Sequence, residues 1–256
     1  MRITVKVGTS TLAHATGRLN IQRMEGLCKV LSDLKNAGHE IILVSSGAIG
    51  MGVGKLGLRE RPKDIPSKQA AAAVGQCELM YTYDKLFSEY HHTVAQLLIT
   101  GDDTTNDTRR LNFTNTLNRL LELGALPVIN ENDTVATDEI VIGDNDTLAA
   151  IVARSVHADM LILLSDIDGL YTADPHTHPE AALLHHVARV DDHIREIAGI
   201  SSSTQGTGGM VTKLHAADIC LGCGCKMVIA NGNNPGNLYD ILEGKTVGTT
   251  FSEERL

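Results

Sequence analysis

The chain has 256 residues, of which 43% are hydrophobic, and it carries a formal net charge of −9. That length and composition can bury a substantial core, in one domain or in one domain with two lobes. The acidic balance disfavours nucleic acid as a partner, because phosphate backbones carry the same sign of charge, and the chain has no Trp to stack on bases.

Short apolar runs rich in β-branched residues alternate with helical patterns along the chain. Most of these runs are apolar throughout, which is typical of strands that are buried on both faces of a parallel sheet. The predicted strands are Ile3–Val7, Glu40–Ser45, Val94–Ile99, Pro127–Ile129, Met160–Leu164, Met227–Ala230 and Thr246–Phe251.

Helical patterns lie between these strands, each with an apolar stripe at helical spacing. The first begins near Asn20 and stops at Gly38, the second takes Ser67 as its N-cap, and Asp144 or Asn145 caps a later one. The stripes are Met24, Leu27, Leu31 and Leu34; Val74, Cys77 and Tyr81; Leu117, Leu120 and Leu121, ended by Gly124; Leu148, Ile151 and Val152; and Met210, Leu214 and Ala217. The repeated strand–helix–strand order predicts an α/β fold, a three-layer αβα sandwich around an open, mainly parallel sheet.

Small and polar residues follow several predicted strands, where ligands bind in open α/β sheets. Gly8-Thr9-Ser10 follows the first strand, which ends near Lys6, and residues 45–50 follow the second. A third glycine-rich loop, residues 206–210, opens the helix that carries Lys213. Small residues let backbone N–H groups approach an anion, and a following helix adds its dipole. One glycine-rich loop is weak support for a phosphate-binding site. Three such loops, two of them with an associated lysine, favour a protein that binds or transfers phosphate.

Two polar runs, residues 130–133 (Asn-Glu-Asn-Asp) and 143–146 (Gly-Asp-Asn-Asp), offer donors and acceptors suited to the charged ends of an amino acid. Helix capping accounts for part of the second run. The G-x-G-x-x-G match at residues 52–57 lacks the strand–turn–helix context of a dinucleotide site. The carboxylates have no evident His or Glu partners for general acid–base catalysis, so we do not favour a hydrolase.

The N-terminal residues do not form a secretory signal, and no apolar stretch approaches the roughly 20 residues that cross a bilayer. Five cysteines, an odd number, fit a reducing cytoplasm. Cys220, Cys223 and Cys225 form a C-x-x-C-x-C pattern that lacks an obvious fourth metal ligand beyond His215. We favour a helix end followed by a strand, in which these cysteines act as small hydrophobes.

Taken together, its motifs make the sequence resemble the glutamate 5-kinases of the amino-acid kinase superfamily over nearly its whole length. Single motifs recur across the superfamily, but Ser-Ser-Gly-Ala-Ile and Asn-Glu-Asn-Asp point to the glutamate enzymes. The motifs that carry the resemblance are residues 6–10, 44–49, 127–133, 143–146, 169–175 and 206–213.

The resemblance implies that Lys6 and Lys213 contact the transferring phosphoryl group from either side, while Asp146 holds both lysines. It also implies ATP as a cofactor, together with Mg²⁺ held mostly by ATP oxygens, so no metal-binding residues are assigned. The implied ATP-binding residues are Lys6, Gly8, Thr9, Ser165, Asp166, Thr207, Gly208, Gly209, Met210, Val211, Thr212 and Lys213.

Ser46, Asp133 and Asn145 are implied to bind L-glutamate, with Asp133 near its ammonium group. The implied organisation is a single amino-acid kinase domain over residues 1–256. Its N-terminal part would bind glutamate and its part from about residue 160 would bind ATP. Many relatives carry a C-terminal PUA domain, which we expect this form to lack. We also expect proline as a feedback inhibitor and a homo-oligomer, either dimer or tetramer.

Three alternatives stay open. A sister kinase would phosphorylate acetylglutamate, carbamate, aspartate or UMP, but Asp133 favours an acceptor with a free ammonium group. A non-catalytic nucleotide-binding sensor would have no use for both Lys6 and Lys213. Composition alone does not separate these enzymes from a generic α/β scaffold.

Overall fold

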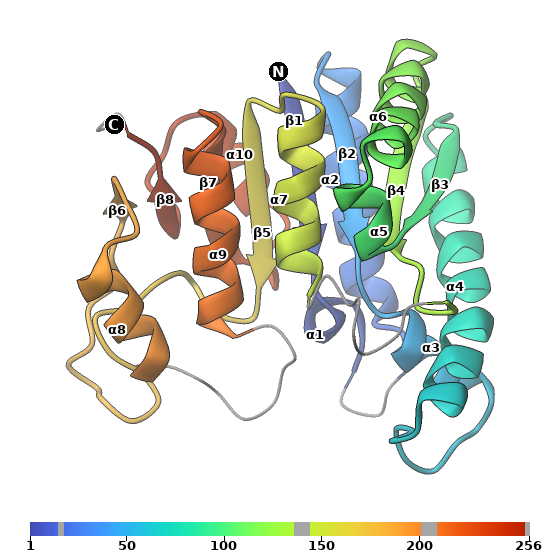
Figure 1. The fold of residues 1–256 in the computed structure, drawn as a ribbon, viewed down its shortest axis with the longest axis horizontal. Coiled ribbons are helices and arrows are strands. Elements are labelled where there is room, and N and C mark those ends of the chain that lie inside the picture. The colour runs from blue at the N-terminus through green and yellow to red at the C-terminus, as the bar shows by residue number, and fades with distance from the viewer. Residues whose placement is uncertain (15–17, 136–143, 201–208, 254–256) are drawn as a thin grey trace. The chain divides into compact units, whose positions relative to one another are not determined.

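The computed structural model describes residues 1–14, 18–135, 144–200 and 209–253 (Figure 1). The chain divides into two compact units. We call residues 7–142 the N-terminal unit, and residues 1–6 together with 143–256 the C-terminal unit. Across the described ranges, no helix combines the length and the apolar character needed to span a membrane.

The N-terminal unit holds three parallel strands in the order β3-β4-β2. They are β2 (Glu40–Ser45), β3 (Val94–Ile99) and β4 (Leu126–Glu131). The register places Val44 opposite Ile129 in the β2–β4 pair. β2 and β4 are buried along most of their length, whereas β3 is only partly buried, as expected for the outermost of the three.

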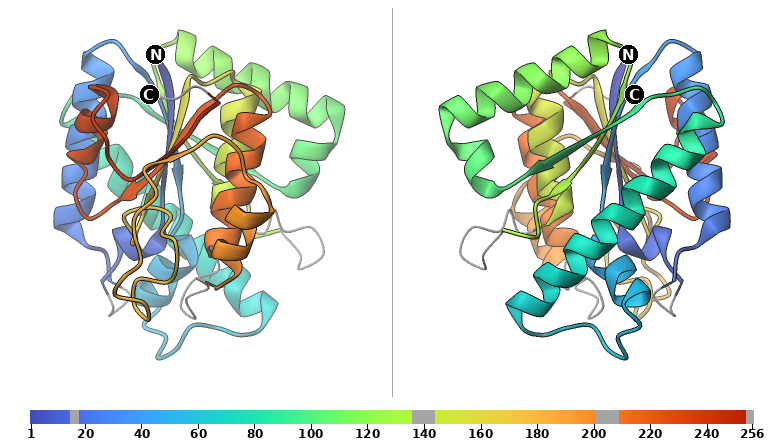
Figure 2. Two further views of the ribbon diagram at one scale, coloured as in Figure 1. Left: turned by 90° about the vertical axis from the view of Figure 1, so that its left-hand side faces the viewer. Right: turned by 90° about the vertical axis from the view of Figure 1, so that its right-hand side faces the viewer.

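Helices cover both faces of these strands, with α2 and α6 on opposite sides (Figure 2). The long α4 packs closely on α3, and it also contacts α2 and β3. The helices of this unit are α1 (Thr9–Leu12), α2 (Ile21–Asn36), α3 (Ala48–Lys55), α4 (Ile65–Ser88), α5 (Gly101–Thr105) and α6 (Asp107–Glu122).

The strands of the C-terminal unit follow the order β1-β5-β7-β8-β6. β5 and β7 pair in parallel, β8 runs antiparallel to β7, and β6 runs parallel to β8. Every residue of β5 is buried, as the apolar run Met160–Leu164 indicates. The strands are β1 (Arg2–Val7), β5 (Met160–Ser165), β6 (His186–Val187), β7 (Lys226–Asn231) and β8 (Thr249–Phe251).

In this unit α7 packs against α9 on one face of the strands, and α10 lies on the other face (Figures 1 and 2). The helices are α7 (Asn145–Ser155), α8 (Asp192–Ile200), α9 (Met210–Leu221) and α10 (Asn237–Leu242). Each unit is therefore a layer of strands between two layers of helices. The predicted three-layer α/β class with a mainly parallel sheet is confirmed.

All seven predicted strands are present, although β8 begins at Thr249 and not at Thr246. The predicted stripe of α2 is fully buried, and Asn20 caps this helix by accepting a hydrogen bond from the Arg23 backbone N–H at 3.2 Å. Gly38 follows the helix with φ +93°, a backbone conformation that favours glycine. The stripe of α9 is also buried as predicted.

Two details of α4 were predicted wrongly. Its N-cap is Asp64, whose carboxylate accepts a hydrogen bond from the Ser67 backbone N–H at 2.9 Å, so the helix begins three residues earlier. The proline at position 66 fits this first turn because the first N–H groups of a helix need no intrahelical partner. Its buried face is not the predicted stripe, since Cys77 and Tyr81 are exposed and Leu79, Tyr83 and Phe87 are buried instead.

The sequence did not predict α3, whose three glycines lower helix propensity. Close packing explains two glycines at this contact. A Cβ atom on Gly52 would lie 1.8 Å from the Ala71 carbonyl oxygen, and one on Gly75 would lie 1.7 Å from the Ala48 carbonyl oxygen. The backbones of α3 and α4 are therefore in contact, and the G-x-G-x-x-G match lies largely within a packed helix.

Candidate functional site

Two buried lysines share one buried carboxylate in the C-terminal unit. Lys6 Nζ lies 2.5 Å from Asp146 Oδ1, and Lys213 Nζ lies 3.0 Å from Asp146 Oδ2. Asp146 is completely buried, and the two lysines are 9% and 6% exposed. The structure thus brings together the three residues that the resemblance implied for catalysis. We call them the Lys–Asp–Lys cluster.

Three different elements supply the cluster. Lys6 lies near the end of β1, Asp146 in the first turn of α7, and Lys213 in the first turn of α9. Asp144 caps α7, accepting hydrogen bonds from the backbone N–H groups of Asp146 at 2.6 Å and Thr147 at 2.9 Å. The choice between Asp144 and Asn145 as the cap is therefore settled for Asp144. The cap sets the direction in which the Asp146 side chain leaves the helix.

The lysines keep Asp146 ionised. Burial by itself would raise the pKa of Asp146, but the charges of Lys6 and Lys213 outweigh burial and hold this pKa below its usual value. Burial dominates for neighbouring Asp144 and raises its pKa, despite the hydrogen bonds it accepts from the backbone. Two ammonium groups around one carboxylate give the cluster a net positive charge, which suits an anionic ligand.

Thr212 is a further partner of the cluster. Its Oγ1 lies 3.2 Å from Asp146 Oδ2 and 2.8 Å from the Gly209 carbonyl oxygen. The sequence placed Thr212 in the ATP site only, and it did not predict the contact with the carboxylate. The contact depends on α7 lying beside α9, which is a tertiary feature without a local sequence signal.

The remaining residues predicted to bind ATP in this unit lie near the ends of β5 and α9. Ser165 ends β5 and donates a hydrogen bond to Asp166 Oδ1 at 3.1 Å. Gly209 is the N-cap of α9, Met210 is buried and Val211 is exposed. Thr207, Gly208 and Gly143 lie outside the described residues.

Other predicted residues belong to the N-terminal unit. Gly8 caps the short α1, in which Thr9 is exposed, and Ser46 lies between β2 and α3. Asp133 follows β4 and is half-buried. Burial raises the pKa of Asp133, with a smaller opposing effect from the charge of Arg61. Asn145, the third residue predicted to bind glutamate, is the first residue of α7 in the C-terminal unit.

The cysteine pattern is a helix end followed by a strand, as predicted. Cys220 lies in the last turn of α9, Gly224 has φ +72°, and Cys225 precedes β7. The backbone N–H of Cys225 donates to the Cys220 carbonyl oxygen at 3.0 Å, which is the hydrogen bond of a Schellman motif. Cys220 and Cys225 are buried, so they occupy the positions of the apolar pair that often accompanies this motif.

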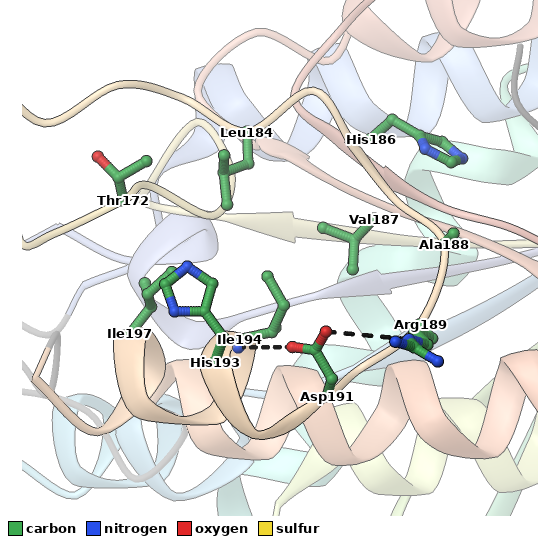
Figure 3. Close-up of a pocket in the computed structure, with 10 residues that line it drawn as sticks. All are labelled: Thr172, Leu184, His186, Val187, Ala188, Arg189, Asp191, His193, Ile194 and Ile197. Atoms are coloured by element: carbon green, nitrogen blue, oxygen red, sulfur yellow. Dashed lines mark hydrogen bonds and ion pairs between the residues drawn. The ribbon is translucent and has the colours of Figure 1, made fainter.

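A separate cavity of about 350 Å³ lies between α8 and the segment around β6 (Figure 3). Its apolar lining includes Leu184, Val187 and Ile197, and Asp191 beside it lies 3.9 Å from the Arg189 side chain. None of the predicted site residues that the structure describes lines this cavity.

The fold agrees with comparisons to known proteins. The model of the amino acid kinase family matches residues 1–231. The chain belongs to the amino acid kinase family. Similar folds occur in a carbamate kinase from Giardia lamblia, with a TM-score of 0.72, 14% identity and coverage of 99% of this chain and 98% of that one. A UMP kinase from Bacillus anthracis has a TM-score of 0.67, 16% identity and coverage of 99% and 96%.

The chain has much more similar relatives among the glutamate 5-kinases. The glutamate 5-kinase of Clostridium perfringens is 52% identical over 254 residues, which cover 98% of this chain and 94% of that protein. The glutamate 5-kinase of Caldanaerobacter subterraneus subsp. tengcongensis is 53% identical over 98% of this chain and 68% of that protein.

Proposed function

We propose that this protein transfers the γ-phosphate of ATP to the γ-carboxylate of L-glutamate, forming γ-glutamyl phosphate as the first step of proline biosynthesis. The Lys–Asp–Lys cluster is the observation that carries the proposal. Its two ammonium groups are buried, and one ionised carboxylate joins them. The similarity to glutamate 5-kinases supports glutamate as the acceptor.

The chemistry explains why a general base is not needed. A carboxyl group with a pKa near 4.3 is already an anion at neutral pH, so it can attack without losing a proton. The difficulty is the repulsion between two anions and the charge that spreads over the transferring oxygens. Lys6 and Lys213 address both, and one preorganised donor of this kind contributes about 3–4 kcal/mol to transition-state stabilisation.

Asp146 acts through the two lysines. Its negative charge compensates the buried positive charges, and each of its two oxygens holds one of the ammonium groups. We assign Thr212, Ser165, Asp166 and the N-terminus of α9 to the side that binds ATP. Gly8, Thr9, Thr207 and Gly208 complete that assignment by resemblance.

Both oxygens of Asp146 already face lysines, so this carboxylate is not offered as a metal ligand. Within the described ranges, no group of three or more His, Cys, Asp or Glu side chains could hold a metal. By resemblance, we assign Mg²⁺ to the phosphate oxygens of ATP, where it would neutralise charge.

We assign glutamate binding to Ser46, Asp133 and Asn145. The Asp133 carboxylate would pair with the ammonium group of the amino acid, and hydroxyl and amide groups would contact its carboxylates. We also propose a cytoplasmic homo-oligomer that proline inhibits.

The decisive assay measures ADP release with ATP and Mg²⁺ while the acceptor is varied among L-glutamate, acetylglutamate, aspartate, carbamate and UMP. Hydroxylamine in the assay traps an acyl phosphate as the hydroxamate. We expect both signals with L-glutamate. ADP release that depends on one of the other acceptors, with none for glutamate, would instead identify a sister kinase.

A pair of lysine variants tests the role of the cluster. Lys213→Ala should lower turnover by at least about 10², the size expected when one such donor is lost. Lys245→Ala serves as the matched control, because Lys245 is a surface lysine paired with Asp240. Full activity of Lys213→Ala would refute the assignment and favour a nucleotide-binding protein without catalysis.

A further inference from the structure

A buried amide in the N-terminal unit has one end without a hydrogen-bond partner in the described part of the chain. Gln76 on α4 is 7% exposed, and its Oε1 accepts a hydrogen bond from Asn130 Nδ2 at 2.9 Å. Asn130, near the end of β4, is 2% exposed. Gln76 Nε2 is fully buried and has no hydrogen-bond partner among the residues that the structure describes.

The hydrogen-bond network supports this orientation of the two amides. Asn130 Oδ1 accepts a hydrogen bond from the Glu131 backbone N–H at 2.9 Å, and a backbone N–H can only donate. The other end of the Asn130 amide must therefore be its NH₂ group, which points to Gln76. Gln76 must meet that donor with Oε1, so its own NH₂ group is the end left over.

Such a donor is unusual, because almost all buried polar groups in folded proteins have a hydrogen-bond partner. An unpaired NH₂ group inside a protein needs an oxygen atom, and the described residues do not supply one. A ligand with acceptor oxygens would provide one.

The surroundings of Gln76 indicate which ligand. A Cβ on its neighbour Gly75 would lie 1.7 Å from the Ala48 carbonyl oxygen, so this turn of α4 touches the start of α3. Two turns further along α4, Tyr83 Oη lies 2.8 Å from Oγ of Ser45, the last residue of β2. Gln76 is thus held between the segment of residues 45–48 and the segment that begins at Asn130. These segments contain Ser46 and Asp133, the residues assigned to glutamate in this unit.

We propose that Gln76 Nε2 donates a hydrogen bond to a carboxylate oxygen of the amino-acid substrate, which makes Gln76 a further residue that binds and orients the acceptor. The proposal rests on the proposed function. A carboxylate is the best match, because its oxygens only accept hydrogen bonds, and a bond to a charged acceptor is stronger than one to a neutral acceptor. Asn130 acts through Gln76 and holds its amide in this orientation.

The test removes the hydrogen-bond donor of the Gln76 side chain and keeps its acceptor. In Gln76→Glu, a carboxylate oxygen can still accept from Asn130 Nδ2, but the NH₂ donor is replaced by a second anionic oxygen. We expect the KM and the Kd for L-glutamate to rise at least about 10- to 150-fold, the range for losing one hydrogen bond to a charged group. The KM for ATP should stay within about twofold.

Tyr83→Phe is the matched control, since it removes a buried hydrogen bond from the same face of α4. Its KM for glutamate should stay close to that of the wild type. If Gln76→Glu does not fold, as judged by circular dichroism, Gln76→Met replaces it. That variant keeps a side chain of similar length without a donor, and it should also raise the Kd for L-glutamate measured by calorimetry.

The outcomes separate this proposal from the proposed function. A wild-type protein that neither binds nor phosphorylates L-glutamate would overturn both. A wild-type protein that is active, with a folded Gln76 variant whose Kd for glutamate is unchanged, would overturn only the role of Gln76. In that case ordered water satisfies the amide. A rise in the KM for ATP equal to that for glutamate would also refute the proposal, because it would indicate a general structural defect.

Discussion

Replacing Asp146 by Asn tests how the Lys–Asp–Lys cluster is held together. The substitution keeps the shape of the side chain and removes its charge, so Lys6 and Lys213 lose their shared counter-ion. Both lysines are buried, and removing one partner of a buried ion pair typically costs about 3–5 kcal/mol.

We therefore expect Asp146→Asn to lower the free energy of unfolding by about 3–5 kcal/mol at pH 7, measured by urea denaturation. This is a large share of the 5–15 kcal/mol that is typical of folded proteins. Asp240→Asn is the matched control, because it removes the carboxylate from a surface pair with Lys245, and surface pairs contribute little. Its unfolding curve should overlay that of the wild type.

The pH dependence gives a second check on the same variant. The pKa of Asp146 is lower in the folded protein than in the unfolded chain, so its contribution to stability is present above the unfolded pKa. That contribution is lost as the pH falls through the folded pKa. The stability difference between wild type and Asp146→Asn should thus be complete at neutral pH and shrink in acid. Equal stability of the two proteins at pH 7 would refute the reasoning.

Gly75→Ala should destabilise the protein by at least about 1–3 kcal/mol, because the new Cβ would meet the Ala48 carbonyl oxygen. At Gly50 a new Cβ would have no neighbour closer than 3.6 Å, so Gly50→Ala should lower the melting temperature much less than Gly75→Ala. Asn20→Ala removes the N-cap of α2 and should lower the free energy of unfolding, measured by urea denaturation, by about 1 kcal/mol. Asn20→Asp should retain most of the wild-type stability, because Asp also caps helices well. Burial raises the pKa of Asp133, and a protonated Asp133 cannot pair with the ammonium group of glutamate. The KM for glutamate should therefore rise as the pH falls through that raised pKa. Asp133→Asn should have a high KM that lacks this pH dependence.

Local chemistry made the strands and several helices predictable. Runs such as Met160–Leu164 have no polar residue, which is typical of a strand buried on both faces. The stripe of α2 and its cap at Asn20 could be read because both depend on residues within the same helix. Where a sequence offers two polar residues near one helix start, this reasoning is weaker, as Asp64 and Ser67 of α4 illustrate.

The motifs also indicated which residues matter for the candidate site, since resemblance pointed to Lys6, Asp146 and Lys213. Their distances could not be read from the sequence. The three residues come from different elements, and only the packing of α7 against α9 beside β1 and β5 brings their charged groups within 3.0 Å. The contact of Thr212 with Asp146 was missed for the same reason.

The sequence by itself determined the order of the seven predicted strands and of the helices with apolar stripes, and the residue types available for phosphate transfer, because backbone preferences and apolar periodicity act over a few neighbouring residues. Only the tertiary structure revealed that α3 is a helix, and one of its three glycines, Gly52, is explained by contact with α4. It also decided that one carboxylate is shared by two lysines and that the Gln76 amide is left with a spare donor. These features depend on the burial of polar groups from distant parts of the chain, where the loss of water makes each partner essential.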